Sequence, residues 1–212
     1  MLSLKNHLLV IAEKKMVNND PSHDFLHAKR VLMLAENICK KEGGDMEVLL
    51  PAALFHDVVI YLKNDPRSKL APEESAAYIF SELENISKYP KEKIEKVKTA
   101  ITECSFSRGT DPSSLESKIL QDADRLEATG AISVMRTFSS TGQMNRIFYH
   151  PADPFAKKRN PNPSLYAVDL FYTRLLRVGK MMNTKTAKNM AKRRTKLLEE
   201  FLNELKLELK GK

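Results

Sequence analysis

The sequence is poor in cysteine, glycine and proline, and each shortage excludes a class of protein. Its 212 residues include two cysteines, Cys39 and Cys104, which form neither a disulfide framework nor a spaced set of metal ligands. This usage fits a reducing compartment, so we expect a cytoplasmic protein. With 7 Gly, 10 Pro and 42% hydrophobic residues, the chain is typical of a helix-rich globular protein.

Long apolar runs are also missing. Residues 8–12 and 48–62 form the longest apolar stretches, and they are too short or too interrupted to cross a bilayer, which needs roughly 20 apolar residues. The N-terminal MLSLKNHLLVIAEKK lacks the small-residue cleavage site of a secretory signal. We therefore expect no membrane partner.

Acidic residues are absent from one part of the chain. The formal net charge is +8, and eight Lys or Arg residues with no acid lie between Arg177 and Lys196. Such a run either attracts phosphate-bearing ligands or forms a solvated helix face. The run lacks aromatic residues that could stack on bases, and it contains no groove-entering motif. We interpret it as a solvated face and do not expect nucleic acid as a partner.

The patterns that are present predict an all-α fold. Apolar residues recur at helical spacing, and Pro, Gly, Asn and Asp mark the breaks. We expect helices over residues 3–18, 24–41, 46–62, 71–87, 90–104, 115–130, 131–138, 165–182 and 184–209. The irregular segment over about 139–164 is long enough for a lid or a binding loop. We expect one domain, residues 1–212, with two C-terminal helices over about 165–209.

The apolar stretch AALFHDVV carries an imidazole next to a carboxylate, His56 and Asp57. Its apolar neighbours predict burial, and a buried carboxylate costs several kcal/mol unless it is paired or binds a metal. We expect both residues in the second half of a central helix, about 100° apart around its axis. The pair therefore needs partners from elsewhere in the chain.

Two other segments supply candidate partners for this pair. His27 lies on the apolar face of the helix expected over 24–41, and His23 precedes it by four residues. In QDADRLEATG, Asp122 and Asp124 would point about 200° apart in a helix, so both cannot serve one site equally. Imidazole and carboxylate ligands suit Mn²⁺, Fe²⁺, Co²⁺ or Ni²⁺ with open coordination positions, and also Zn²⁺.

The order of these residues resembles a known family. His27, then His56-Asp57, then Asp124 within Ala-Asp-Arg-Leu resembles the H…HD…D signature of the HD superfamily of metal-dependent phosphohydrolases. Four segments are similar to those of small single-domain HD hydrolases, over most of residues 20–205: SHDFLHAKRV, AALFHDVV, LESKILQDADRLEATGAISVMRTF and KMMNTKTAKNMAKRR. The resemblance implies a compact multi-helix HD-domain bundle.

The resemblance also implies roles for individual residues. Four metal ligands are expected, His27, His56, Asp57 and Asp124, although a register with His23 or Asp122 stays open. Asp57 is expected to be catalytic, because it would both bind the ion and orient the attacking water. The expected substrate-binding residues are one histidine and four cations near the motifs, namely His23, Arg30, Lys63, Arg125 and Arg136.

The implied function is hydrolysis of a nucleotide or another small phosphate ester or anhydride by a water that one divalent metal ion activates. Mn²⁺, Fe²⁺, Co²⁺ or Ni²⁺ is expected ahead of Zn²⁺ or Mg²⁺. The alternative is a non-catalytic metal-binding HD module that senses a ligand or associates with nucleic acid. The sequence does not indicate an oligomeric state.

The chain departs from the family pattern at two places. Cys104, in ECSFS, stands where relatives often have histidine, which puts a substrate or metal role at that position in doubt. Val58, Val59 and Ile60 follow His56-Asp57, in place of the nearby acid that some HD nucleotidases use. The extra ligands of two-metal HD phosphodiesterases are not evident, so we expect a single metal ion.

Overall fold

The structure is a computed structural model that describes residues 2–17, 23–61, 65–105 and 109–212. Within these residues the chain is helical and contains no β-strand, apart from one isolated parallel bridge between Ile147 and Tyr166. The expected all-α class is therefore confirmed. None of the helices described there is both long and apolar enough to span a membrane.

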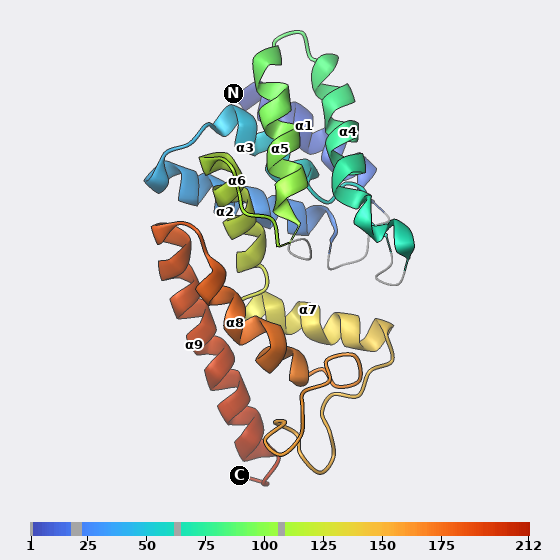
Figure 1. Cartoon of the computed structure of the whole chain (residues 1–212), viewed down its shortest axis with the longest axis vertical. Helices are drawn as coiled ribbons and strands as arrows, with labels where there is room; N and C mark the ends of the chain where they lie inside the picture. The colour runs from blue at the N-terminus through green and yellow to red at the C-terminus, as the bar shows by residue number, and fades with distance from the viewer. Residues whose placement is uncertain (1, 18–22, 62–64, 106–108) are drawn as a thin grey trace. The chain divides into compact units, whose positions relative to one another are not determined.

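The chain divides into two compact units, unit 1 (Met1–Asp124) and unit 2 (Arg125–Lys212), with the boundary inside α6. Figure 1 labels the main helices of both units. The longer helices of unit 1 are α1 (Leu2–Lys15), α2 (Phe25–Glu42), α3 (Met46–Phe55), α4 (Ala71–Glu84), α5 (Ile94–Cys104) and most of α6 (Leu115–Leu126). Two short 3-10 turns, η1 (Pro66–Lys69) and η2 (Lys91–Lys93), lie between them.

The central helix of unit 1 is α3. Every side chain from Val48 to Phe55 is buried, and α3 packs against α1, α2, α4 and α5. A helix that is apolar around its whole circumference can only be accommodated in the middle of a bundle. The expected central position of this segment is confirmed.

Short polar residues set the ends of the helices that carry the histidines. The Asp24 carboxylate accepts a hydrogen bond from the backbone N–H of His27 and so caps α2, while Asp45 caps α3 through the N–H of Glu47. Gly43, at a φ of +86°, ends α2 and donates its N–H to the carbonyl of Cys39. These caps fix the residues at which α2 begins and ends and at which α3 begins.

The expectation that α3 continues to residue 62 is wrong. The helix ends at Phe55, so His56 and Asp57 follow it instead of lying in its second half. Val59 donates its N–H to the hydroxyl of Ser75 on α4, and the same hydroxyl approaches the Val59 carbonyl. A helix would need these backbone groups for its own bonds, so the tertiary contact and the β-branched residues 58–60 end it early.

A proline inside α3 is compensated by a tyrosine from the connection between α4 and η2. Pro51 has no N–H, so the carbonyl of Glu47, four residues earlier, lacks its helical donor. The hydroxyl of Tyr89, a side chain that is 2% exposed, donates to this carbonyl over 2.9 Å. The buried helix therefore keeps its carbonyl satisfied at the position where proline would otherwise leave it unpaired.

Unit 2 is built around an aromatic core. It contains α7 (Gly130–Gln143), the π-helix η4 (Phe171–Leu175), α8 (Leu176–Val178), the 3-10 turn η5 (Gly179–Met181) and α9 (Lys185–Glu208). Phe171 and Phe201 stack with ring centroids 5.5 Å apart, and Phe138 packs against both rings. Leu198 and Leu202 of α9 complete the buried cluster.

The irregular segment lies later than the expected 139–164. α7 continues to Gln143, because the hydroxyls of Ser140 and Thr141 bond back to the Thr137 carbonyl and are satisfied inside the helix. The helix expected from 165 starts only at 169. Residues 165–168 instead form turns and exchange backbone hydrogen bonds with Ile147 and Phe148, so the helix cannot start there.

This segment is held by a buried ion pair. The Arg159 guanidinium donates to the carboxylate of Asp169, which is fully buried, and lies 4.8 Å from the ring centroid of Tyr166. The N–H of Asn162 also donates to Asp169. A long loop with these contacts has a defined conformation.

Candidate metal centre

Four side chains from three separate segments converge within unit 1. His27 lies in the first turn of α2, His56 caps the C-terminus of α3, Asp57 follows it, and Asp124 lies on α6. The sequence brings His27 to this point because Asp24 fixes the start of α2 one turn before it. The early end of α3 lets Asp57 turn towards the same point as His56.

The distances between these side chains are short. The Nε2 atoms of His27 and His56 are 3.3 Å apart. Asp57 Oδ2 lies 3.7 Å from Nε2 of His27 and 3.5 Å from Nε2 of His56. The corresponding distances to Asp124 Oδ1 are 3.6 and 3.8 Å. Both carboxylates therefore face the narrow space between the two imidazoles.

Burial differs between the two kinds of side chain. The imidazoles of His27 and His56 are 1% and 2% exposed, whereas the carboxylates of Asp57 and Asp124 are 33% and 24% exposed. The nitrogen ligands thus form the floor of the site and the oxygen ligands form its open side. The group is therefore in contact with solvent on the side of the carboxylates.

The backbone of α3 sets the orientation of His56. Its Nδ1 lies 3.0 Å from the carbonyl oxygen of Ala53, so Nδ1 carries the proton and donates it. Nε2 is therefore the nitrogen that faces His27 and the carboxylates. Metal-binding histidines commonly have one nitrogen held by a carbonyl in this way.

The ionisable side chains of the group shift one another's pKa. Burial alone would lower the pKa of His56, but the charge on Asp57 and the interaction with Asp124 outweigh it and raise this pKa to about 9. Burial also opposes ionisation of Asp57 and Asp124, yet the charge on His56 and the contacts with both imidazoles hold their pKa below the usual range. The two carboxylates thus favour a positive charge on His56.

The donor set fits a divalent metal ion. His27, His56 and Asp124 each offer one ligand atom, and these atoms lie within 4.8 Å of one another. The Nε2 atoms of the two imidazoles are 3.3 Å apart, so one ion could be bound by both nitrogens in place of the hydrogen bond that links them. Two nitrogen and two carboxylate donors suit Mn²⁺, Fe²⁺, Co²⁺, Ni²⁺ or Zn²⁺.

The alternative ligands, Asp122 and His23, lie differently from the four converging side chains. Asp122 is fully buried two positions before Asp124 on α6, and helix geometry directs its side chain to nearly the opposite side of the helix from Asp124. His23 approaches the group from outside, with Nε2 at 4.0 Å from Asp57 Oδ2 and a side chain that is 33% exposed. Its ring lies edge-on to that of His27.

The expected substrate-binding cations are spread over the chain. Arg30 is half-buried on α2, one turn after His27. Lys63 lies outside the described residues. Arg136 is half-buried on α7 in unit 2. Arg125, also in unit 2, is 8% exposed and donates to the carbonyl of Met181, so its guanidinium takes part in the internal structure of that unit.

Two contributors to the site were missed by sequence reasoning. The Ala53 carbonyl orients His56, and the Ser75 hydroxyl holds the backbone of Val59 just after Asp57. A backbone carbonyl has no sequence signal of its own. Ser75 is a buried polar residue on an apolar helix face, which is the one signal that could have found it.

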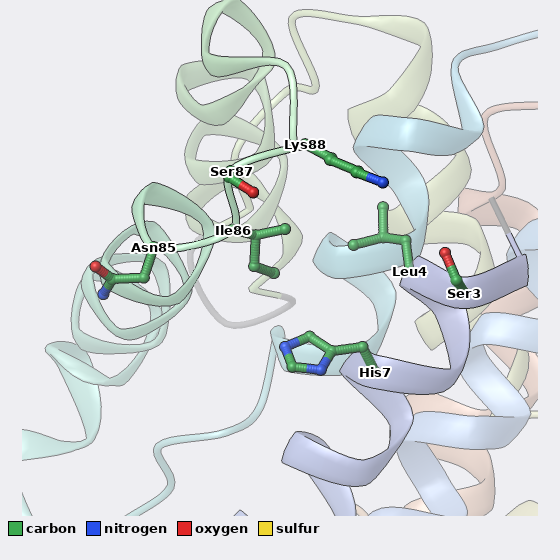
Figure 2. A pocket seen from close by; sticks show the side chains of 7 residues that line it. All are labelled: Ser3, Leu4, His7, Asn85, Ile86, Ser87 and Lys88. Atoms are coloured by element: carbon green, nitrogen blue, oxygen red, sulfur yellow. The ribbon is translucent and has the colours of Figure 1, made fainter.

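A hollow elsewhere in unit 1 has none of the features of the metal centre. Figure 2 shows it between the first turns of α1, with Leu4 and His7, and the connection after α4, with Ile86 and Lys88. Lys88 and His7 are exposed, and none of the metal-centre residues lines the hollow. It does not compete with the metal centre as the functional site.

Comparisons with known proteins place the chain in a family. The HD domain family matches residues 25–129, which span all four side chains of the metal centre. The uncharacterized protein YpgQ of Bacillus subtilis is 32% identical over 200 residues, 92% of this chain and 89% of that protein.

Solved structures agree with this match over nearly the whole chain. YpgQ in complex with ADP has a TM-score of 0.76 and 28% identity, and the match covers 98% of this chain and 95% of YpgQ. An HD-superfamily hydrolase from Bacillus thuringiensis has a TM-score of 0.74 and 26% identity, covering 100% and 99% of the two chains. The chain therefore belongs to the HD superfamily of metal-dependent hydrolases.

Proposed function

We propose that the protein hydrolyses a nucleotide, or another small phosphate ester or anhydride, with the help of one divalent metal ion. The convergence of His27, His56, Asp57 and Asp124 in one half-open group carries this proposal. Family membership supports hydrolysis. The complex of the relative YpgQ with ADP supports a nucleotide as the ligand.

The protein side chains would perform separate tasks. A bound divalent ion would supply an activated water and polarise a phosphoryl oxygen. His27 and His56 would hold the ion from the buried side, with His56 kept in one orientation by Ala53. Asp57 is one-third exposed and reaches both imidazoles, so it can bind the ion with one oxygen and orient the attacking water with the other.

Cationic groups on the open side would bind the phosphate oxygens. His23 is the best placed of the candidates, because it lies beside Asp57 and is partly exposed. Arg30, on the same helix as His27, is the second. Both would stabilise negative charge that increases as the phosphorus–oxygen bond breaks. Lys63, Arg125 and Arg136 remain predictions from the sequence.

The test compares His56→Ala and Asp57→Ala with the control His7→Ala, an exposed histidine of the same unit. Metal content and hydrolysis of a panel of nucleotides and phosphomonoesters with Mn²⁺ are measured on the same preparations. We expect the two site variants to lose metal and to lose at least about 100-fold in turnover. Removal of a metal ligand lowers activity more than removal of a residue that only supports a ligand. His7→Ala should match the unaltered protein.

Two outcomes would contradict this assignment. Unchanged metal content and turnover in both site variants would show that the group is not the active site. A protein that retains its metal but hydrolyses no member of the panel would favour the non-catalytic alternative.

A further inference from the structure

Positive charge is concentrated in unit 2. Residues 125–212 contain 18 Lys or Arg against 7 Asp or Glu, a net charge of +11. Residues 1–124 contain 17 against 20, a net charge of −3, so unit 2 carries the whole excess. A strong charge asymmetry between two parts of a chain indicates a polyanionic partner for the charged part.

The first half of α9 is the most basic helix surface of unit 2. Lys185, Lys188 and Lys192 are exposed and follow one another at steps of three and four residues, so they share one face. Lys196 continues the row and lies 3.6 Å from Glu200, in the second half of the helix, which contains its acids. We call Lys185, Lys188 and Lys192 the lysine row.

The lysine row conflicts with two rules of helix stability. The first turn of α9 contains no acid, although the helix dipole favours negative charge there and disfavours Lys185. Like charges at steps of three or four also repel. Where local rules are broken in this way, a functional surface is the usual reason.

A second basic strip lies on the element next to α9. Arg177 and Lys180 are exposed on α8 and η5, which pack against α9 (Figure 1). Gly179 makes this close approach possible, because a Cβ at that position would lie 2.9 Å from Oγ1 of Thr195. The two strips therefore belong to one packed pair of helices in unit 2.

We propose that the lysine row binds the phosphate backbone of a nucleic-acid duplex without reading its sequence. The lysine row extends about 10 Å along α9, a length that several successive phosphates of one strand occupy. Its face contains Asn189 and Lys196 but no large apolar side chain that would enter a bilayer. α9 also presents no exposed aromatic ring on which single-stranded bases could stack.

The sequence alone had favoured a solvated face. The division into units and the exposure of the row change that interpretation, because the excess positive charge lies in unit 2 and the three lysines of the row are exposed. The proposed binding is independent of hydrolysis at the metal centre.

The test is fluorescence anisotropy with short DNA and RNA duplexes at several salt concentrations. The triple variant Lys185→Gln, Lys188→Gln, Lys192→Gln is compared with the matched control Lys206→Gln, Lys210→Gln, Lys212→Gln. Both remove three exposed lysines from the C-terminal part of the chain. We expect the row variant to bind at least about tenfold more weakly and to lose about 1 per lysine from the slope of log K against log salt.

The control should bind as the unaltered protein does, and both variants should keep their helical content and hydrolytic activity. The proposal is overturned if the unaltered protein binds neither duplex at low salt, or if both triple variants weaken binding equally. It is also overturned if the protein binds vesicles of anionic phospholipid, or an acidic polypeptide, in preference to either duplex.

Discussion

At the scale of single residues, the choice of Asp124 over Asp122 decides which face of α6 carries the chemistry. Asp124 Oδ1 lies within 3.8 Å of both imidazoles, whereas Asp122, two positions earlier, is fully buried. Positions two apart on a helix point to nearly opposite sides. One carboxylate can therefore be a ligand and the other an internal structural residue.

This difference predicts unequal effects of two matched substitutions. Asp124→Asn should reduce retained metal and lower turnover by at least about 100-fold, because an amide is a poorer ligand than a carboxylate. Asp122→Asn should leave the metal content of the folded protein unchanged. Metal analysis of both purified variants checks this, and equal loss of metal in the two would reverse the assignment.

The raised pKa of His56 predicts how the metal-free protein depends on pH. A group with a folded pKa of about 9, above its ordinary value of 6.5, adds stability that is complete below pH 6.5 and is lost as the pH rises through 9. Unfolding by denaturant with EDTA present should therefore give a falling free energy over this interval. The His56→Asn variant should show a smaller fall, and an identical fall would argue against His56 as the source.

At the scale of elements, α3 shows how a rule of helix formation can be broken and compensated. Pro51 removes a backbone donor from the most buried helix, and the hydroxyl of Tyr89 replaces it at the Glu47 carbonyl. Tyr89→Phe should cost about 1–3 kcal/mol of unfolding free energy, because it leaves a buried acceptor unpaired.

A second substitution tests whether this bond is the reason. Pro51→Ala restores an N–H that can reach the Glu47 carbonyl, so Tyr89→Phe should cost less in that background than in the unaltered protein. Equal costs in the two backgrounds, measured by denaturant unfolding, would show that Tyr89 contributes only through packing.

The contact between η5 and α9 depends on the absence of a side chain. Gly179→Ala would place a methyl group 2.9 Å from Oγ1 of Thr195 and 3.5 Å from Cβ of Ala191. We expect a loss of about 1–3 kcal/mol. In a Thr195→Ala background the closest obstacle is gone, so most of this loss should disappear. A full loss there would indicate that glycine is needed for another reason.

At the scale of the whole molecule, the sequence predicts what local chemistry determines. Helix periodicity, with Pro, Gly, Asn and Asp at the breaks, predicted the all-α class and the approximate positions of α2 and α5. The residues between helices were harder to predict, because tertiary contacts determine where each helix ends and the next begins. Ser75 ends α3 by binding Val59, and the pairing of residues 165–168 with Ile147 delays the following helix. Neither partner is near in sequence.

The metal centre likewise combines features that the local sequence predicts with features that only tertiary structure determines. Residue types and their order predicted the four side chains that the structure brings together, but no local pattern requires three distant segments to converge. The Ala53 carbonyl that orients His56 was invisible in the sequence. The charge difference between the two units also required the structure, since the boundary lies inside α6.

The central claim is that one divalent ion held by His27, His56, Asp57 and Asp124 supports phosphate hydrolysis. Its most direct test is a titration of Mn²⁺ into EDTA-treated protein, with bound metal and nucleotide hydrolysis followed together. We predict no turnover without metal and a rise that saturates when one ion is bound per chain. Turnover without metal, or turnover that appears only with a second bound ion, would contradict the account.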